Sequence, residues 1–173
     1  MKRLIGIGLA LVAFTISAVA VAGTATTLTG TAEWSGGTLE TPATTTVIHG
    51  TFDGPLGKGT YEGTLVGADA PTSTPCNGPV CQPVTGSITF SGHRGSFTGV
   101  VQPGSVVGLI GIASHSFRNF DLTLRVTNGT RGYTNASGLL TLSYTSTWAH
   151  FFDSEGNFIN TITDQGTLTG SLR

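Results

Sequence analysis

Alternation of apolar and polar residues dominates this chain and predicts a β-rich fold. In the segment 120–126, apolar residues occupy every second position, with Asp121, Thr123 and Arg125 between them. Successive side chains of a β-strand point to opposite faces, so this period of two predicts a strand with one buried face. The segment 140–152 repeats the pattern. The residues that share its expected inner face are Leu140, Leu142, Tyr144, Ser146, Trp148, His150 and Phe152.

Turn-forming residues separate several further strand-like segments. Strands are expected over 26–34, 44–52, 60–66, 84–91 and 96–102. The segments 158–163 and 166–172 are expected to form either two strands or one strand with a glycine kink. The segment 104–114 is apolar on both faces, which leaves a buried strand and a plugging loop as alternatives. No helix is expected after the N-terminal apolar segment.

Glycine-centred hairpin signatures recur three times, at 59–63, 95–99 and 132–138. Glycine supplies the positive φ that tight hairpins need, so the repetition predicts strands joined hairpin by hairpin into an antiparallel sheet. Closing such a sheet removes the exposed edges that promote aggregation. The fold class expected is therefore all-β, a single antiparallel up-and-down β-barrel of about eight strands; a β-sandwich is the competing architecture.

The first 22 residues have the pattern of a cleaved signal peptide. Lys2 and Arg3 precede the apolar run 4–22, which ends in the small-x-small sequence Ala20-Val21-Ala22. This order is typical of export signals, whereas a retained membrane anchor is usually longer. We therefore assign 1–22 to the signal peptide and 23–173 to the barrel domain, and expect a secreted, periplasmic or cell-envelope protein.

Charge is scarce, which narrows the choice of partners. Only 10% of the residues are charged, the formal net charge is −1, and Ser, Thr, Asn and Gly supply most of the polarity. The sequence shows no basic run that would bind nucleic acid or an anionic membrane surface. We expect no nucleic-acid partner, and no membrane association after signal cleavage.

The two cysteines, Cys76 and Cys81, flank the turn-forming sequence Asn77-Gly78-Pro79-Val80. In an oxidising compartment this spacing favours a local disulfide. A redox motif has two intervening residues rather than four, and no second cysteine pair completes a zinc site.

The segment 128–138, Asn-Gly-Thr-Arg-Gly-Tyr-Thr-Asn-Ala-Ser-Gly, resembles the Gly-Gly-Thr-Gly-Arg-Phe-x-Gly-Ala-Thr-Gly hairpin of allene oxide cyclase barrel-like proteins. The segment 92–99 resembles a degenerate second copy. In this chain Arg131-Gly132 inverts the order of the motif, and Asn135 replaces a glycine. The resemblance implies an eight-stranded barrel related in shape to dirigent proteins and lipocalins, in a family with many secreted bacterial members of unassigned role. The resemblance assigns no catalytic residue to this chain.

No set of residues in the sequence predicts a catalytic, metal or cofactor site. The four histidines lack metal-ligand spacing, the carboxylates are scattered, and no Gly-x-Ser-x-Gly elbow occurs. His150 has two interpretations, a hydrogen-bonded residue at a strand end and a polar group in a pocket.

A barrel lumen is the remaining candidate site. Eight strands enclose either packed side chains or one small ligand. The lumen candidates are Trp34, Phe90, Phe120, Leu122, Tyr144, Trp148 and His150. Glycines at inward positions (Gly30, Gly63 and Gly86) favour room for a small apolar molecule. A non-catalytic structural role at the cell envelope, carried by the threonine-rich exterior, is the first alternative, and an isomerase like the plant cyclase is the second.

The export signal makes a prediction about the mature N-terminus. Mass spectrometry of protein recovered outside the cytoplasm is expected to show a chain that begins at Gly23, or at Val21 if cleavage follows Ala20. Secreted protein that still carries Met1 would contradict this interpretation.

Overall fold

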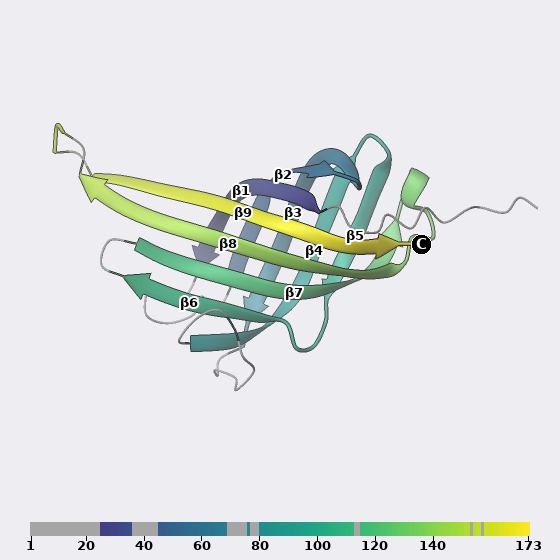
Figure 1. Ribbon diagram of the computed structural model, residues 1–173, viewed down its shortest axis with the longest axis horizontal. Helices are drawn as coiled ribbons and strands as arrows, with labels where there is room; N and C mark the ends of the chain where they lie inside the picture. The colour runs from purple at the N-terminus through teal and green to yellow at the C-terminus, as the bar shows by residue number, and fades with distance from the viewer. Residues whose placement is uncertain are drawn as a thin grey trace, which may run out of the picture.

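The computed structural model describes residues 25–35, 45–68, 76, 80–112, 115–152, 154–156 and 158–173. The expected signal peptide lies outside these residues. The strands in chain order are β1 Thr26–Ser35, β2 Thr45–Gly54, β3 Gly57–Gly67, β4 Val80–Gly92, β5 Gly95–Val101, β6 Val106–Ile112, β7 His115–Gly129, β8 Gly138–Phe152 and β9 Phe158–Leu172 (Figure 1). The one helical element in this part of the chain is a short 3-10 turn, η1, at Arg131–Tyr133.

The strands form a closed antiparallel β-barrel, which confirms the expected fold class. Strands that are consecutive in sequence pair with one another, except β5 and β6, and β1 closes the circuit by pairing with β9. Eight strands complete the circuit, and the ninth, β6, lies with β5 between β4 and β7. The meander follows from short turns such as Pro55-Leu56, because a two-residue connection can join only adjacent antiparallel strands.

The strands β5 and β6 are two halves of one line, interrupted at residues 102–105. Gly104 has a φ of +91°, and the Ser105 amide donates to the carbonyl of Gln102 at 3.2 Å. With Pro103 before this glycine, the segment forms a type II β-turn. The Ser105 carbonyl accepts from Val84 N–H, so pairing with β4 continues through the turn. The segment 104–114, ambiguous in sequence, therefore contains a strand rather than only a loop.

Several strands are longer than the sequence pattern indicated. β7 begins at His115 and β4 at Val80, and β9 runs without a break from Phe158 to Leu172. The predicted disulfide between Cys76 and Cys81 is confirmed, with the two Cα atoms 5.8 Å apart. It ties residue 76 to the start of β4, where Cys81 pairs with Gly108 of β6.

The barrel interior contains a column of aromatic side chains in contact. The rings of Phe90 and Phe97 are stacked with centroids 4.9 Å apart, and the centroid of the Tyr133 ring is 5.1 Å from that of Phe97. We define the aromatic column as Phe52, Tyr61, Phe90, Phe97, Phe120, Tyr133 and Tyr144. Large aromatic rings contribute much of the buried apolar surface of a domain, so this column is the centre of the core.

One end of the barrel is closed by η1 and the hairpin turns beside it, and we call it the plug end. The Tyr133 hydroxyl donates to the carbonyl of Leu56, and the Arg94 guanidinium lies 5.8 Å from the centre of the Tyr133 ring. Arg131 and Asn135 take left-handed conformations, with φ of 52° and 66°. The motif at 128–138 therefore builds the plug as well as the connection between β7 and β8. The C-terminus lies at this end, and β8 and β9 extend farthest in the opposite direction (Figure 1).

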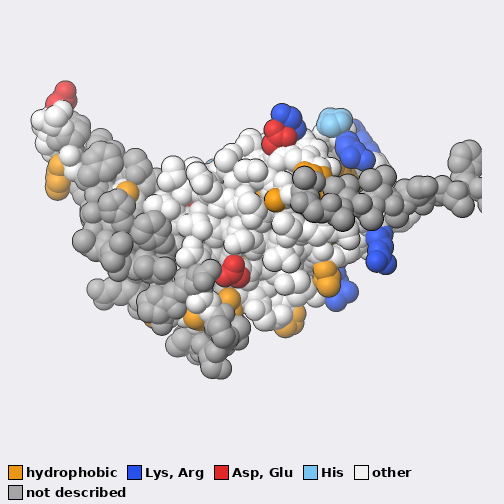
Figure 2. Space-filling model, in the orientation of Figure 1, with side chains coloured by type: hydrophobic (Ala, Val, Ile, Leu, Met, Phe, Trp, Pro, Cys, Tyr) orange, Lys and Arg blue, Asp and Glu red, His pale blue; other side chains and the backbone are white. Residues whose placement is uncertain are grey.

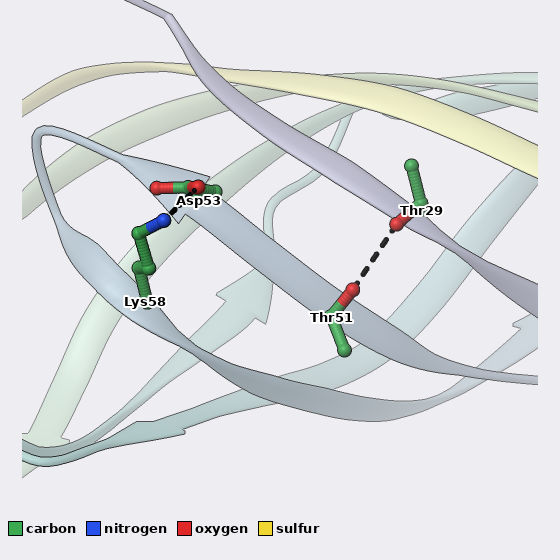
Figure 3. Close-up of polar contacts among 4 residues, drawn as sticks. All are labelled: Thr29, Thr51, Asp53 and Lys58. Carbon is green, nitrogen blue, oxygen red and sulfur yellow. Dashed lines mark hydrogen bonds and ion pairs between the residues drawn. The ribbon is translucent and has the colours of Figure 1, made fainter.

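The outer face of the barrel is covered mainly by uncharged polar side chains. Thr29 and Thr51 on β1 and β2 lie 3.1 Å apart at their hydroxyl oxygens, and Lys58 pairs with Asp53 across the β2–β3 hairpin at 2.7 Å (Figure 3). Figure 2 shows few charged side chains on this face, with Lys and Arg gathered toward the plug end. Cross-strand hydroxyl pairs of this kind add modestly to sheet stability. Among the residues described, no helix has the length and apolar character needed to span a membrane.

The fold predicts a strong effect of one glycine substitution. A Cβ atom at Gly30 would lie 2.1 Å from the His49 carbonyl oxygen and 2.4 Å from the Tyr61 hydroxyl, and the backbone contact cannot yield. Gly30→Ala is therefore expected to lower the free energy of unfolding by about 3 kcal/mol. Thr29→Ala, on the outer face of the same strand, is the matched control and should change it by only about 0.5 kcal/mol. Urea denaturation followed by circular dichroism measures both, and equal effects would contradict the prediction.

Candidate functional site

Four of the residues expected in the lumen lie together inside the barrel. Phe90, Phe120, Leu122 and Tyr144 are all buried members of the core. The side chains of Trp34, Trp148 and His150 lie outside the described part of the structure. Their backbone positions are described: Trp148 and His150 follow Ser146 on β8, away from the plug end. Phe152, expected on the same face, is 70% exposed because β8 has by then run past the barrel.

A chain of hydrogen bonds crosses the interior from β3 to β9. The Tyr144 hydroxyl donates to Asp164 Oδ2 at 2.7 Å, and the Tyr61 and Tyr144 hydroxyl oxygens are 3.0 Å apart. A phenol has a single hydrogen to donate. Since that of Tyr144 is used on Asp164, Tyr61 donates to Tyr144. Both donors therefore point toward the carboxyl group, which is 3% exposed.

Glycines on β1 and β2 let Tyr61 reach across the barrel wall. Tyr61 pairs with Gly50, Gly50 with Gly30, and Gly30 with Asp164, so all four lie in one cross-strand row. The Tyr61 hydroxyl occupies the space beside Gly30 that a Cβ would need. Gly166 gives the Tyr144 ring similar room, since a Cβ there would lie 2.6 Å from Tyr144 Cδ2.

These contacts correct the expectation that inward glycines leave room for a ligand. The space at Gly30 is taken by Tyr61 and that at Gly63 by Ile88, while a Cβ at Gly86 would lie 2.1 Å from the carbonyl oxygen of Thr64. The glycines serve close packing of neighbouring side chains and strands.

Next to Asp164 the interior holds two further polar side chains. Ser146 of β8 pairs with Asp164 on one side and with Arg118 of β7 on the other. Ser146 is fully buried and Arg118 is 4% exposed. Ser146 Oγ and Asp164 Oδ1 have no hydrogen-bond partner among the residues that the structure describes. We call Asp164, Ser146, Tyr144 and Tyr61 the polar cluster.

Burial shifts the proton affinities of the interior groups. It raises the pKa of Asp164 above its ordinary value, while the Tyr144 hydrogen bond, the nearby Ser146 hydroxyl and the charge of His49 oppose the shift. Ser146 has this influence although its hydroxyl does not meet full hydrogen-bond geometry. The folded state is therefore favoured when Asp164 is protonated, and this stability is lost as the pH rises through the raised pKa. Burial also lowers the pKa of Arg118 to about 10.

The pKa values of Tyr61 and Tyr144 are raised, as is that of Asp164. Burial raises the pKa of Tyr61 to about 12, and the charge of Asp164 adds to this shift. The pKa of Tyr144 is raised further, by burial and by its bond to Asp164. At neutral pH both phenols are therefore protonated, and each uses its single hydrogen within the cluster. It can bind a polar group or hold a proton beside one.

Sequence reasoning placed Tyr144 in the site but did not select Tyr61, Ser146, Asp164 or Arg118. Asp164 lies in phase with Gly166 and Leu168, and Arg118 with Phe120 and Leu122. If the alternation had been followed farther along both strands, it would have predicted that Asp164 and Arg118 point into the barrel. The bond from Tyr61 to Tyr144 has no sequence signal, because 83 residues separate the partners.

No group of three or more His, Cys, Asp or Glu residues within the described ranges could hold a metal ion. Comparison of the chain with family models, with curated proteins and with solved structures finds no match. The closed barrel by itself does not identify a family, since unrelated proteins share this architecture.

The buried phenols predict an unusual alkaline titration. The chain has three tyrosines, and burial also raises the pKa of Tyr133, although the charge of Arg94 opposes the shift. Tyrosinate absorbance is therefore expected to stay low through pH ~10, the ordinary tyrosine pKa, and to appear in a steep step together with loss of circular dichroism. Stability from these groups is present below the unfolded pKa and is lost as the pH rises toward the folded values. The denatured protein is the control and should titrate near pH ~10; a gradual titration there in the folded protein would contradict the prediction.

Proposed function

We propose that this protein is a secreted β-barrel that binds one small, mostly apolar molecule in its interior, on the side of the polar cluster away from the plug end. The observation that carries the proposal is the pair of buried polar atoms, Ser146 Oγ and Asp164 Oδ1, that lack a hydrogen-bond partner among the described residues. A buried polar atom without a partner costs about 1–3 kcal/mol. A bound molecule that satisfies these atoms would recover that free energy.

The surroundings of the polar cluster suit such a molecule. Small-molecule sites are mostly apolar and contain a few placed polar groups. Here the aromatic column runs from the plug end to Tyr61 and Tyr144 of the cluster, and Ala32, Ile48 and Ile88 line the wall on the other side with no exposure to solvent. Since η1 and Leu56 close the plug end, a molecule would enter from the opposite end. The backbone positions of Trp34, Trp148 and His150 lie toward that end of their strands.

The proposed location outside the cytoplasm is supported by the Cys76–Cys81 disulfide, which is compatible with an oxidising compartment. The basic and then apolar start of the chain supports export independently. An isomerase like the plant cyclase rests on the motif at 128–138 and would need the same interior site. The structural role at the cell envelope needs no interior site, so a binding experiment separates it from the other two.

The neutral naphthalene dye prodan is a suitable probe, titrated into the purified protein while tryptophan emission is followed. We expect one prodan per barrel, with energy transfer from tryptophan. Trp148→Ala is expected to weaken binding about tenfold, because an apolar side chain that buries against the probe contributes on the order of 1.5–3 kcal/mol.

Thr147→Ala is the matched control for this experiment, since residue 147 points to the opposite face of β8, and it should leave the affinity unchanged. Absence of binding, or equal binding by both variants and the original protein, would overturn the proposal. An experimental structure without an interior cavity of at least ~300 Å³ would do the same and would leave the structural role.

A further inference from the structure

We infer that the bound molecule carries a neutral hydroxyl group, and that this hydroxyl donates to Asp164 Oδ1 and lies against Ser146 Oγ. The inference rests on the proposed function and specifies the chemistry of the ligand at the same site. The molecule is thus an alcohol with an apolar body, rather than a hydrocarbon, an ether or an amine.

The arrangement of donors around Asp164 decides what the ligand must supply. The hydrogen of Tyr144 goes to Oδ2, and that of Tyr61 goes to Tyr144. Oδ1 of the same carboxyl group has no donor within the described part of the chain. While it is ionised, this carboxyl group only accepts hydrogen bonds, so a ligand that satisfies Oδ1 must bring a donor. A hydrocarbon or an ether has none.

Ser146 adds a requirement that a hydroxyl meets well. The Ser146 hydroxyl is adjacent to Asp164 on the paired strand, is fully buried, and has one hydrogen to donate and lone pairs that accept. A ligand hydroxyl can donate to Asp164 and accept from Ser146 at the same time. One ligand oxygen therefore satisfies both buried atoms.

The charges inside the barrel favour a neutral donor over an ammonium group. Arg118 and Asp164 are the two charged side chains buried within the described residues, and they lie on either side of Ser146 in one cross-strand row. An ammonium ligand would bring a further positive charge next to the row that holds Arg118 in a low-dielectric interior, which is unfavourable. A hydroxyl adds no charge.

Three probes with the same number of non-hydrogen atoms test the inference: 1-nonanol, octyl methyl ether and nonylammonium, each titrated calorimetrically. We expect 1-nonanol to bind at least about tenfold more tightly than octyl methyl ether, since a hydrogen bond to a charged group has an effect of that order. Nonylammonium should bind more weakly than 1-nonanol.

Two variants test whether the preference for alcohol over ether arises at Asp164 and Ser146. Asp164→Asn presents an amide that can donate to an ether, so the preference for alcohol over ether should largely disappear. Ser146→Ala should weaken 1-nonanol binding several-fold, and should weaken binding of octyl methyl ether, whose oxygen can also accept from Ser146, by no more than that. Ser143→Ala, on the exposed face of the same strand, is the control and should alter neither. If Asp164→Asn fails to fold, Ser146→Ala still decides.

The outcomes separate this inference from the proposed function. Equal binding of 1-nonanol and the ether would overturn the hydroxyl assignment while the barrel remained a binder of apolar molecules. Tighter binding of nonylammonium would overturn it in favour of a cationic ligand. A preference for alcohol that survives in Asp164→Asn, or 1-nonanol binding that is unchanged in Ser146→Ala, would place the hydroxyl elsewhere. If prodan and all three probes fail to bind, the proposed function itself is overturned.

Discussion

The carboxyl group of Asp164 is the constraint around which the middle of this barrel is arranged. A buried carboxyl requires hydrogen-bond donors. Here the phenol of Tyr144 donates to it, and the phenol of Tyr61 in turn donates a hydrogen bond to Tyr144. Tyr61 can reach only because β1 and β2 carry Gly30 and Gly50 in the row between them. One polar group thus links the side chains of β3, β8 and β9 across β1 and β2 and holds the register of these strands, because a shift by one residue would point Asp164 to the outside.

The aromatic column and the polar cluster divide the interior along its length. From the plug end to Tyr144 the rings contact one another, and the hydroxyls of Tyr61 and Tyr144 form the boundary. Beyond this boundary lie Ser146 and Arg118. A core of this kind combines strong apolar packing with a specific polar interaction.

Much of the architecture could be predicted from the sequence, because strand alternation and hairpin glycines are local signals. The period of two placed Phe120, Leu122 and Tyr144 on the inner face correctly, and the cysteine spacing predicted the disulfide. The β5–β6 interruption was harder to recognise, because its type II turn lies inside a line of strand. The polar cluster was mostly missed, because its bonds join residues that are close only after the barrel closes. The inward glycines were misinterpreted for the same reason: the side chain that fills the space at Gly30 comes from β3.

The turn at 102–105 is a place where the chain can gain or lose residues without a change in the barrel. The chain leaves the line of β5 at Gln102 and resumes it as β6 after Ser105, while the pairing partners β4 and β7 continue past the gap. Gly104 has no neighbouring atom within 4 Å of the position of a Cβ, so the turn points away from the wall. Residues inserted there would form a longer external loop without altering the number of strands or the alignment of the interior rows. The barrel can thus acquire a new surface segment through an insertion or deletion while its interior chemistry stays unchanged.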